Sequence, residues 1–268
     1  MRALSLSQAW DDTKAIITRD GRLFASVALA LVALPAVIEG LVSPRGMDSS
    51  APLWVDGVML VVSLIALAGQ LALIRLALGP SITVGGAIAH GVRRMPIYLL
   101  AALLILVAMF IAAMPFALVL TLLGVPLPAN GAPATPPAVV AAMLYLALIC
   151  FVAVRMLMSA PVASAEPTWP VAIIRRSWEL TAGNWWRLFA FFILFLIAAI
   201  ALVGGLGAAT GVVVRLFVGP ITPLSTGALV VALVQALFNT VVTTCLAVML
   251  ARIYVQLSDR RDVAEVFR

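Results

Sequence analysis

Three polar side chains recur at every fourth position of the last apolar stretch of the chain, namely Gln235, Asn239 and Thr243. Residues four apart lie on one face of an α-helix, so this spacing predicts a polar stripe on a single helix. Polar groups inside a membrane face other helices or a cavity, because lipid cannot satisfy their hydrogen bonds. We expect hydrogen bonds to neighbouring helices, and a substrate path is the alternative.

Gln70 and Glu39 are two further polar residues within apolar stretches. We expect Gln70 to face the same interior as the stripe, so that Gln70, Gln235, Asn239 and Thr243 form one intramembrane polar set. Glu39 lies near the end of its stretch, so we expect exposure at the outer interface. The alternative is that Glu39 completes the polar interior.

Three arginines lie close to the ends of apolar stretches: Arg75, Arg155 and Arg252 come five or six residues before Pro80, Pro161 and Ser258. At about 1.5 Å per residue, each lies less than about 10 Å inside a helix end. At that depth an arginine stretches its stem along apolar surface and its head reaches polar groups. We expect lipid headgroups as the ligands, and carbonyl groups of a neighbouring helix are the alternative.

Catalytic and metal-binding chemistry finds little support in the sequence. His90 is the one histidine and lies beside Arg93 and Arg94, so we expect contact with solvent or headgroups instead of proton transfer. Cys150 and Cys245 lie in different apolar stretches, and we expect two buried thiols that form neither a disulfide nor a metal site. The sequence predicts no enzyme, no cofactor and no metal.

The elements that must position these residues are set by the composition. Apolar residues make up 64% of the 268 residues and charged residues 10%, against about 45–50% and about 25% in soluble domains. No water-soluble fold hides that much apolar surface. The formal charge of +6 comes from arginines that flank apolar stretches, where they contact anionic headgroups. We therefore expect membrane lipids, anionic ones included, and membrane proteins as partners, and no nucleic acid.

Six apolar stretches are long enough to cross a bilayer as helices, since a span needs about 20 residues. They cover residues 23–42, 53–78, 97–123, 139–160, 188–209 and 228–257. Pro35 is expected to kink the first span, and Pro161 to end the fourth. Glycines are expected to end the fifth, with residues 212–218 forming a short helix on the outer face. The fold class is an all-α polytopic membrane helix bundle.

The distribution of basic residues predicts the orientation. Of the 17 Lys and Arg residues, only Arg45 and Arg215 lie in the segments that follow the first, third and fifth spans. Positive charge favours the cytoplasmic side, so we expect both termini in the cytoplasm and the protein in the bacterial cytoplasmic (inner) membrane. Acidic residues such as Asp11 and Asp20 precede the first span, so no cleaved signal peptide is expected.

A single membrane domain, residues 1–268, is predicted to contain three tandem units at about 5–79, 80–161 and 167–258. Each unit is a basic amphipathic helix followed by two spans. Residues 18–24 and 181–189 share the order Thr, Gly, Arg-Leu-Phe, whereas residues 87–94 keep only the basic amphipathic character.

The amphipathic helices carry tryptophan and arginine, the residues that anchor proteins at the headgroup boundary. In the first, Leu6, Trp10, Thr13 and Ile17 share one face. The candidate interfacial residues of the others are Arg93, Arg94, Arg175, Arg176, Arg187, Trp178, Trp185 and Trp186. Packing beneath the bundle is an alternative that does not exclude anchoring. Glu166 and Glu179 are expected to pair with Arg175 or Arg176.

Residues 177–189, Ser-Trp-Glu-Leu-Thr-Ala-Gly-Asn-Trp-Trp-Arg-Leu-Phe, precede a span and are repeated weakly near the N-terminus. This segment resembles the bacterial glycerophosphodiester phosphodiesterase membrane-domain group and related six-span inner-membrane proteins. The resemblance implies a membrane module concerned with lipids or envelope upkeep. Some members continue into a soluble phosphodiesterase barrel, but residues 258–268 leave no room for one, so the activity is not expected here.

Two functions are consistent with these features. The first is a non-enzymatic inner-membrane module that organises lipid or partner proteins through its basic, tryptophan-rich helices. The alternative is a transporter or lipid-translocating protein, in which the polar set lines a path between units that move against each other.

Overall fold

The computed structural model describes residues 5–42, 53–79, 83–122, 135–217, 219 and 225–266, and all regular structure in this part is helical. The N-terminal half contains α1 (Leu6–Ala28), the π-helical η1 (Leu29–Ala33), α2 (Leu34–Val42), α3 (Leu53–Leu78) and α4 (Val84–Leu122). The rest contains α5 (Pro136–Arg155), α6 (Ser159–Ala165), α7 (Pro170–Thr181), α8 (Trp185–Ala199), the π-helical η2 (Ile200–Gly204), α9 (Gly205–Phe217) and α10 (Thr226–Val266).

Within the described residues, six helical stretches are long and apolar enough to cross a membrane. They are Leu6–Val42, Leu53–Leu78, Val84–Leu122, Pro136–Ala165, Trp185–Phe217 and Thr226–Ser258. The predicted all-α fold with six spans is therefore confirmed. Val84–Leu122 is longer than the predicted span because the interfacial segment continues into the span within one helix, and Trp185–Phe217 is longer because the helix continues beyond its glycines.

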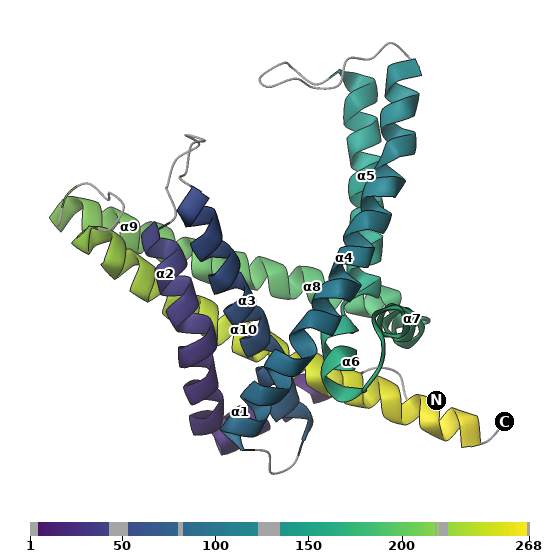
Figure 1. Ribbon diagram of the computed structural model, residues 1–268, viewed down its shortest axis with the longest axis horizontal. Helices are drawn as coiled ribbons and strands as arrows, with labels where there is room; N and C mark the ends of the chain where they lie inside the picture. Colours follow the sequence, from purple (N-terminus) through teal and green to yellow (C-terminus); the bar gives the residue numbers. More distant parts are fainter. Residues whose placement is uncertain are drawn as a thin grey trace.

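The helices form two arms that meet at one end (Figure 1). One arm contains α2, α3, α9 and the first part of α10, and the other is the hairpin of α4 and α5, which stands apart. The helices α1, α6 and α7 gather where the arms meet. Arg75, Arg155 and Arg252 lie at this end, where they contact α6, α7 and α1. Arg94 lies near His90, which contacts α6, while Arg22 belongs to α1 and Arg187 to the first turn of α8, directly after α7. We call this end the basic end. The two clusters of buried apolar side chains centre on it and include Met158, Ile173, Leu188, Ile253, Leu71, Ile74 and Val248.

The first span begins with a kink that separates the amphipathic segment from the apolar one. Asp20 has a φ of −112° and a ψ of 17°, outside the helical region, so the segment before it turns at an angle to the span that follows. Further along, η1 ends just before the buried Pro35. Proline lacks the N–H that would bond to the carbonyl of Leu31, four residues earlier. The expected disturbance at Pro35 thus takes the form of a π-helical segment, a common way to absorb an unpaired carbonyl.

Glycine allows the backbone of α3 to approach this disturbed segment. A Cβ added at Gly69 would lie 2.9 Å from the Leu31 carbonyl oxygen and 2.6 Å from the Leu31 Cβ. A Cβ at Gly91 of α4 would collide with the carbonyl oxygen of Ala68. Small residues at these positions let three consecutive helices pack closely, as is usual between membrane helices.

The amphipathic segments of the second and third predicted units differ in how they join their spans. In the second, residues 84–95 run straight into the span within α4, with Pro96 inside the helix. In the third, α7 ends at Thr181, and Gly183, with a φ of 82°, forms the turn into α8. The left-handed backbone at this position favours glycine, because a side chain would clash there.

Two predicted helix ends are wrong. The fourth span breaks after Arg155 at a turn over residues 156–158, and Pro161 lies in the first turn of α6, where its missing N–H is not needed. The glycines after the fifth span do not end it. The π-helical η2 carries the chain through Gly204 into α9, which reaches Phe217, so residues 212–217 continue the span and form no separate outer-face helix.

Candidate functional site

A cavity of about 310 Å³ lies between α2, α3 and α10, in the arm away from the α4–α5 hairpin. It is lined by Val32, Pro35, Ala36, Glu39, Val62, Ser63, Ala66, Leu67, Gln70, Asn239 and Thr243. Three members of the predicted polar set therefore meet at one place. Glu39 joins them, which was the alternative considered for this residue, although its side chain is also exposed as expected.

Most polar side chains of this cavity have no hydrogen-bond partner among the described residues. Among the described residues, Glu39, Gln70, Asn239 and Thr243 have no hydrogen-bond or ion-pair partner, whereas the hydroxyl of Ser63 donates to the Met59 carbonyl at 2.7 Å. The structure thus gives none of the expected interhelical hydrogen bonds to Gln70, Asn239 or Thr243. Their free donors and acceptors face a space that can hold a polar molecule.

Gln235, the remaining member of the set, lies elsewhere. Its side-chain amide is against α9, where a Cβ added at Gly207 would lie 3.0 Å from the Gln235 Nε2 atom. Successive residues at a spacing of four are offset by about 40° around a helix of 3.6 residues per turn. The stripe therefore drifts around α10, so that its first member contacts α9 while Asn239 and Thr243 line the cavity.

The wall of the cavity is formed by the irregular part of the first span. Val32 belongs to η1, and Pro35 and Ala36 follow directly in α2. A π-helical segment and a proline both displace the following turn, and such segments are frequent at functional sites. The irregular segment at Pro35 therefore forms the wall of the cavity that is shared with Gln70 and Asn239.

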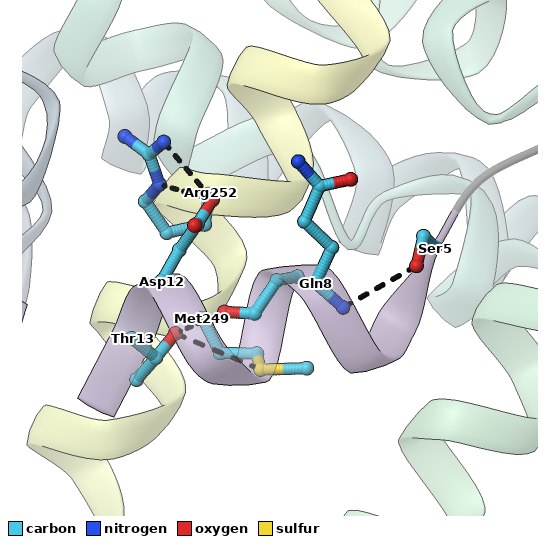
Figure 2. A network of polar contacts seen from close by, with 7 residues as sticks. Ser5, Gln8, Asp12, Thr13, Met249 and Arg252 are labelled. Atoms are coloured by element: carbon cyan, nitrogen blue, oxygen red, sulfur yellow. Dashed lines mark hydrogen bonds and ion pairs between the residues drawn. The ribbon is translucent and has the colours of Figure 1, made fainter. Parts of the chain in front are cut away.

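The span-end arginines have protein partners. Arg252 of α10 donates from Nη2 to Asp12 Oδ2 of α1 at 3.1 Å, and Nε lies 3.4 Å from the same oxygen (Figure 2). Beside this ion pair, the buried Thr13 hydroxyl contacts the Met249 sulfur at 3.8 Å. These contacts attach the first amphipathic helix to the last span.

Arg155 and Arg75 contact neighbouring segments through carbonyl groups, which was the alternative to lipid headgroups. Arg155 Nη1 donates to the Trp178 carbonyl at 3.3 Å, and its guanidinium lies 5.1 Å from the Trp178 ring centre and 5.4 Å from that of Phe151. Arg75 Nη1 donates to the Ser164 carbonyl at 3.4 Å, and His90 Nε2 is 3.0 Å from the same oxygen.

These contacts follow the order of the three predicted units. Arg75 of the first unit meets His90 of the second at a shared carbonyl, Arg155 of the second meets α7 of the third, and Arg252 of the third meets α1 of the first. Arg155 and Arg252 thus contact the amphipathic segment of another unit directly, whereas Arg75 is linked to that of the second unit through the Ser164 carbonyl of α6. The result is a closed ring of contacts at the basic end.

Other arginines of the basic end are free to bind external groups. Within the described residues, Arg22, Arg93, Arg94 and Arg187 have neither a hydrogen bond nor an ion pair, and all except the half-buried Arg94 are exposed. Arg175 and Arg176 are occupied as predicted, since Arg175 pairs with Glu179 at 3.0 Å and Arg176 with Glu166 at 3.2 Å. Tyr254 of α10 also donates to Glu166 at 2.8 Å.

The tryptophans, like the arginines, include some that face outward and one that is held by protein contacts. Trp186 is 75% exposed and Trp178 is 40% exposed. Trp185 stacks on Phe189 with ring centres 5.0 Å apart and donates from Nε1 to the Phe151 carbonyl at 3.4 Å. In α1, Trp10 is 45% exposed while Ala9 and Thr13 are fully buried, so this helix both packs beneath the bundle and presents a tryptophan outward.

Arg22 is not among the predicted interfacial residues, although the sequence carries a signal for it. The order Arg-Leu-Phe at residues 22–24 and 187–189 places Arg22 and Arg187 at the same point of their units, and both are exposed in the structure. The pairing of Asp12 could not be predicted from neighbouring residues, because its partner Arg252 is 240 positions away. No group of three His, Cys, Asp or Glu side chains among the described residues is arranged to hold a metal ion.

Six apolar helices, an intramembrane polar cavity and a basic end with exposed tryptophans define a polytopic helical membrane protein. The chain belongs to the family of the domain of unknown function DUF7847, whose model matches residues 4–257. No curated protein and no solved structure matches the chain.

Proposed function

We propose that the chain is a non-enzymatic module of the bacterial inner membrane that binds anionic lipid at its basic end. The observation that carries this proposal is the contrast between two sets of arginines. The three span-end arginines are held by protein groups. Arg22, Arg93, Arg94 and Arg187 lie where the first, third and fifth spans begin and have no partner among the described residues.

Lipid phosphates are the natural ligands of such arginines. A basic residue near an anionic leaflet contributes about 1 kcal/mol of attraction. Trp186 precedes Arg187 directly, and Trp10 belongs to the same helix α1 as Arg22; both indole rings are exposed. An indole ring at headgroup depth fixes how far a helix end enters the membrane. The lipid-related role implied by the resemblance of residues 177–189 agrees with this proposal.

The orientation with both termini in the cytoplasm is part of the proposal. The described basic residues gather at one end of the helices, and Arg215 lies at the end of α9 on the other side. Positive charge favours the cytoplasmic face. Reporter proteins fused to the two termini should both be active in the cytoplasm, and activity of either one outside it would contradict this orientation.

The lipid proposal is tested with a variant in which Arg22, Arg93, Arg94 and Arg187 are all changed to Gln. Native mass spectrometry after purification in mild detergent should show several-fold less copurified phosphatidylglycerol than in the unmodified protein. Arg215→Gln, which removes an exposed arginine from the opposite end, is the control and should leave the lipid unchanged. Equal lipid in the quadruple variant and the unmodified protein would refute the proposal.

Transport is a second candidate function, and the cavity favours it. Its polar groups lie between helices that are long enough to span a membrane, and they belong to Glu39, Gln70, Asn239 and Thr243. Carriers built from repeats also place their substrate sites between membrane-spanning helices. Loss of solute movement in proteoliposomes on changing Gln70 to Leu, with normal phosphatidylglycerol binding, would favour transport over a purely lipid-organising role.

A further inference from the structure

The polar cavity between α2, α3 and α10 has the chemistry of a binding site. Its four unpartnered polar side chains come from three helices, the consecutive α2 and α3 and the distant α10. Polar groups at membrane depth that meet neither protein nor a polar molecule are unfavourable in hydrocarbon. An occupant that satisfies them must therefore carry both donors and acceptors.

The charge of the lining restricts the occupant further. Glu39 is the one ionisable residue among the described residues that line the cavity, and none of the lining residues is basic. Asn239 and Gln70 are neutral, and their amide oxygens can accept hydrogen bonds from a cation. A cleft lined by one sign of charge concentrates ions of the opposite sign, so the cavity favours a cation over an anion.

Size and apolar lining indicate an organic cation. The volume of about 310 Å³ is at the lower end of the range of about 300–1,000 Å³ for sites that hold small molecules. Val32, Val62 and Leu67 cover the remaining wall, and such side chains contact methyl and methylene groups favourably.

We infer that this cavity binds a small organic cation, with its ammonium group at the Glu39 carboxylate and its polar atoms at Gln70 and Asn239. Glu39 lies three residues before the end of α2 and Gln70 lies eight residues before the end of α3 at the basic end. The ligand thus enters from the end opposite to the basic end and reaches towards the middle of the spans. This inference is independent of lipid binding by the arginines.

The test uses a cysteine placed in the cavity of the full chain. In a background of Cys150→Ala and Cys245→Ala, Ser63→Cys adds a thiol that lines the cavity and leaves Glu39, Gln70, Asn239 and Thr243 unchanged. Ile65→Cys is the control, because Ile65 is 39% exposed on the same helix but is absent from the cavity lining. Both variants are placed in phosphatidylcholine nanodiscs, which are open to reagents on both faces.

Two reagents of opposite charge report on access and charge. The rate ratio of trimethylammonioethyl to sulfonatoethyl methanethiosulfonate should be about tenfold or more higher for Ser63→Cys than for a free thiol such as 2-mercaptoethanol. Ile65→Cys should react with neither reagent, because lipid covers this face of the helix. Adding Glu39→Gln should bring the ratio at Ser63→Cys down to that of the free thiol. Asp56→Asn should leave their ratio unchanged, because Asp56 is exposed on the same arm but does not line the cavity.

Competition with an unreactive cation distinguishes binding in the cavity from mere access of the reagent to it. Choline at millimolar concentration should slow modification of Ser63→Cys by the cationic reagent, and this protection should be lost with Glu39→Gln. The inference is overturned if Ser63→Cys is as unreactive as Ile65→Cys, if the rate ratio of the two reagents equals that of the free thiol, or if choline gives no protection. None of these measurements depends on how much lipid copurifies with the protein. The proposal of cation binding can therefore fail while the proposal of lipid binding holds, and the reverse.

Discussion

Asp12 and Arg252 are 240 positions apart, yet their side chains form an ion pair with the Arg252 Nη2 atom 3.1 Å from Asp12 Oδ2 (Figure 2). The pair joins the first amphipathic helix to the last span. Both side chains are about a third exposed or less, so their attraction is screened less than that of a surface pair. Together with the Arg75 and Arg155 contacts, it closes the ring at the basic end.

Removing this pair should destabilise the bundle. Asp12→Asn or Arg252→Gln should each lower the melting temperature in detergent, and a double-mutant cycle should give a coupling energy of about 1 kcal/mol. Asp11→Asn is the matched control, because Asp11 pairs with Lys14 on the same helix but both side chains are more than half exposed. Additive effects of the two single changes would show that the pair contributes no coupling.

Close packing of α3 against α4 should depend on Gly91. In Gly91→Ala the new methyl group meets the Ala68 carbonyl oxygen, and backbone atoms cannot move aside as a flexible side chain would. Overpacking of this kind costs about 1–3 kcal/mol, which should lower the melting temperature by several degrees. Gly85→Ala has open space around the new methyl group in the same helix and should be neutral or slightly stabilising. An equal response of the two variants would contradict the contact.

The hydroxyl group of Thr244 on α10 should be dispensable. It is buried and has no hydrogen-bond partner in the described part of the chain. Thr244→Val removes an unsatisfied polar group while keeping the shape, so stability should stay level or rise by about 1 kcal/mol. In contrast, Thr240→Val removes a hydroxyl that donates to the Ala236 carbonyl at 2.6 Å. A lower melting temperature for Thr244→Val than for Thr240→Val would contradict the assignment.

The sequence predicted those features of the fold that depend only on residues close together in the chain. Long apolar stretches predicted the six spans, because each must satisfy its own backbone hydrogen bonds in lipid. The pairing of Glu179 with Arg175 was also predictable, since residues four apart meet on one helical turn. The prediction that glycines end the fifth span was wrong. Membrane helices accommodate glycine when the backbone stays hydrogen-bonded, and the backbone stays hydrogen-bonded through η2.

The candidate site was predicted in part. The spacing of Asn239 and Thr243 identified two of the lining residues, because a helical face is a local property. Which helices face that stripe is a property of the tertiary packing. The sequence left open whether Glu39 faces the outer interface or the polar interior, and it could not predict that Gln235 lies against Gly207 of α9. It could not assign protein partners to the span-end arginines either, because Asp12 and the carbonyls of Ser164 and Trp178 are distant in sequence.

Docking of α7 against the fourth span should depend on Arg155. Its guanidinium lies over the Trp178 and Phe151 rings, and its own carbonyl accepts a hydrogen bond from the Ser177 hydroxyl at 2.7 Å. Arg155→Gln keeps the backbone carbonyl but removes the positive charge from between the rings. A partly desolvated cation–π contact is worth about 1 kcal/mol, so the melting temperature should fall and the tryptophan fluorescence should shift to longer wavelength.

Two further variants separate charge from general loss of packing at Arg155. Arg155→Lys keeps a cation that can lie over the same rings, so it should recover part of the lost stability. Arg175→Gln, which removes an arginine that is 82% exposed on α7, should have little effect, because exposed ion pairs contribute little. If Arg155→Lys and Arg155→Gln melt at the same temperature, the positive charge does not hold α7 in place, and the hydrogen bond from Ser177 becomes the main contact between these two helices.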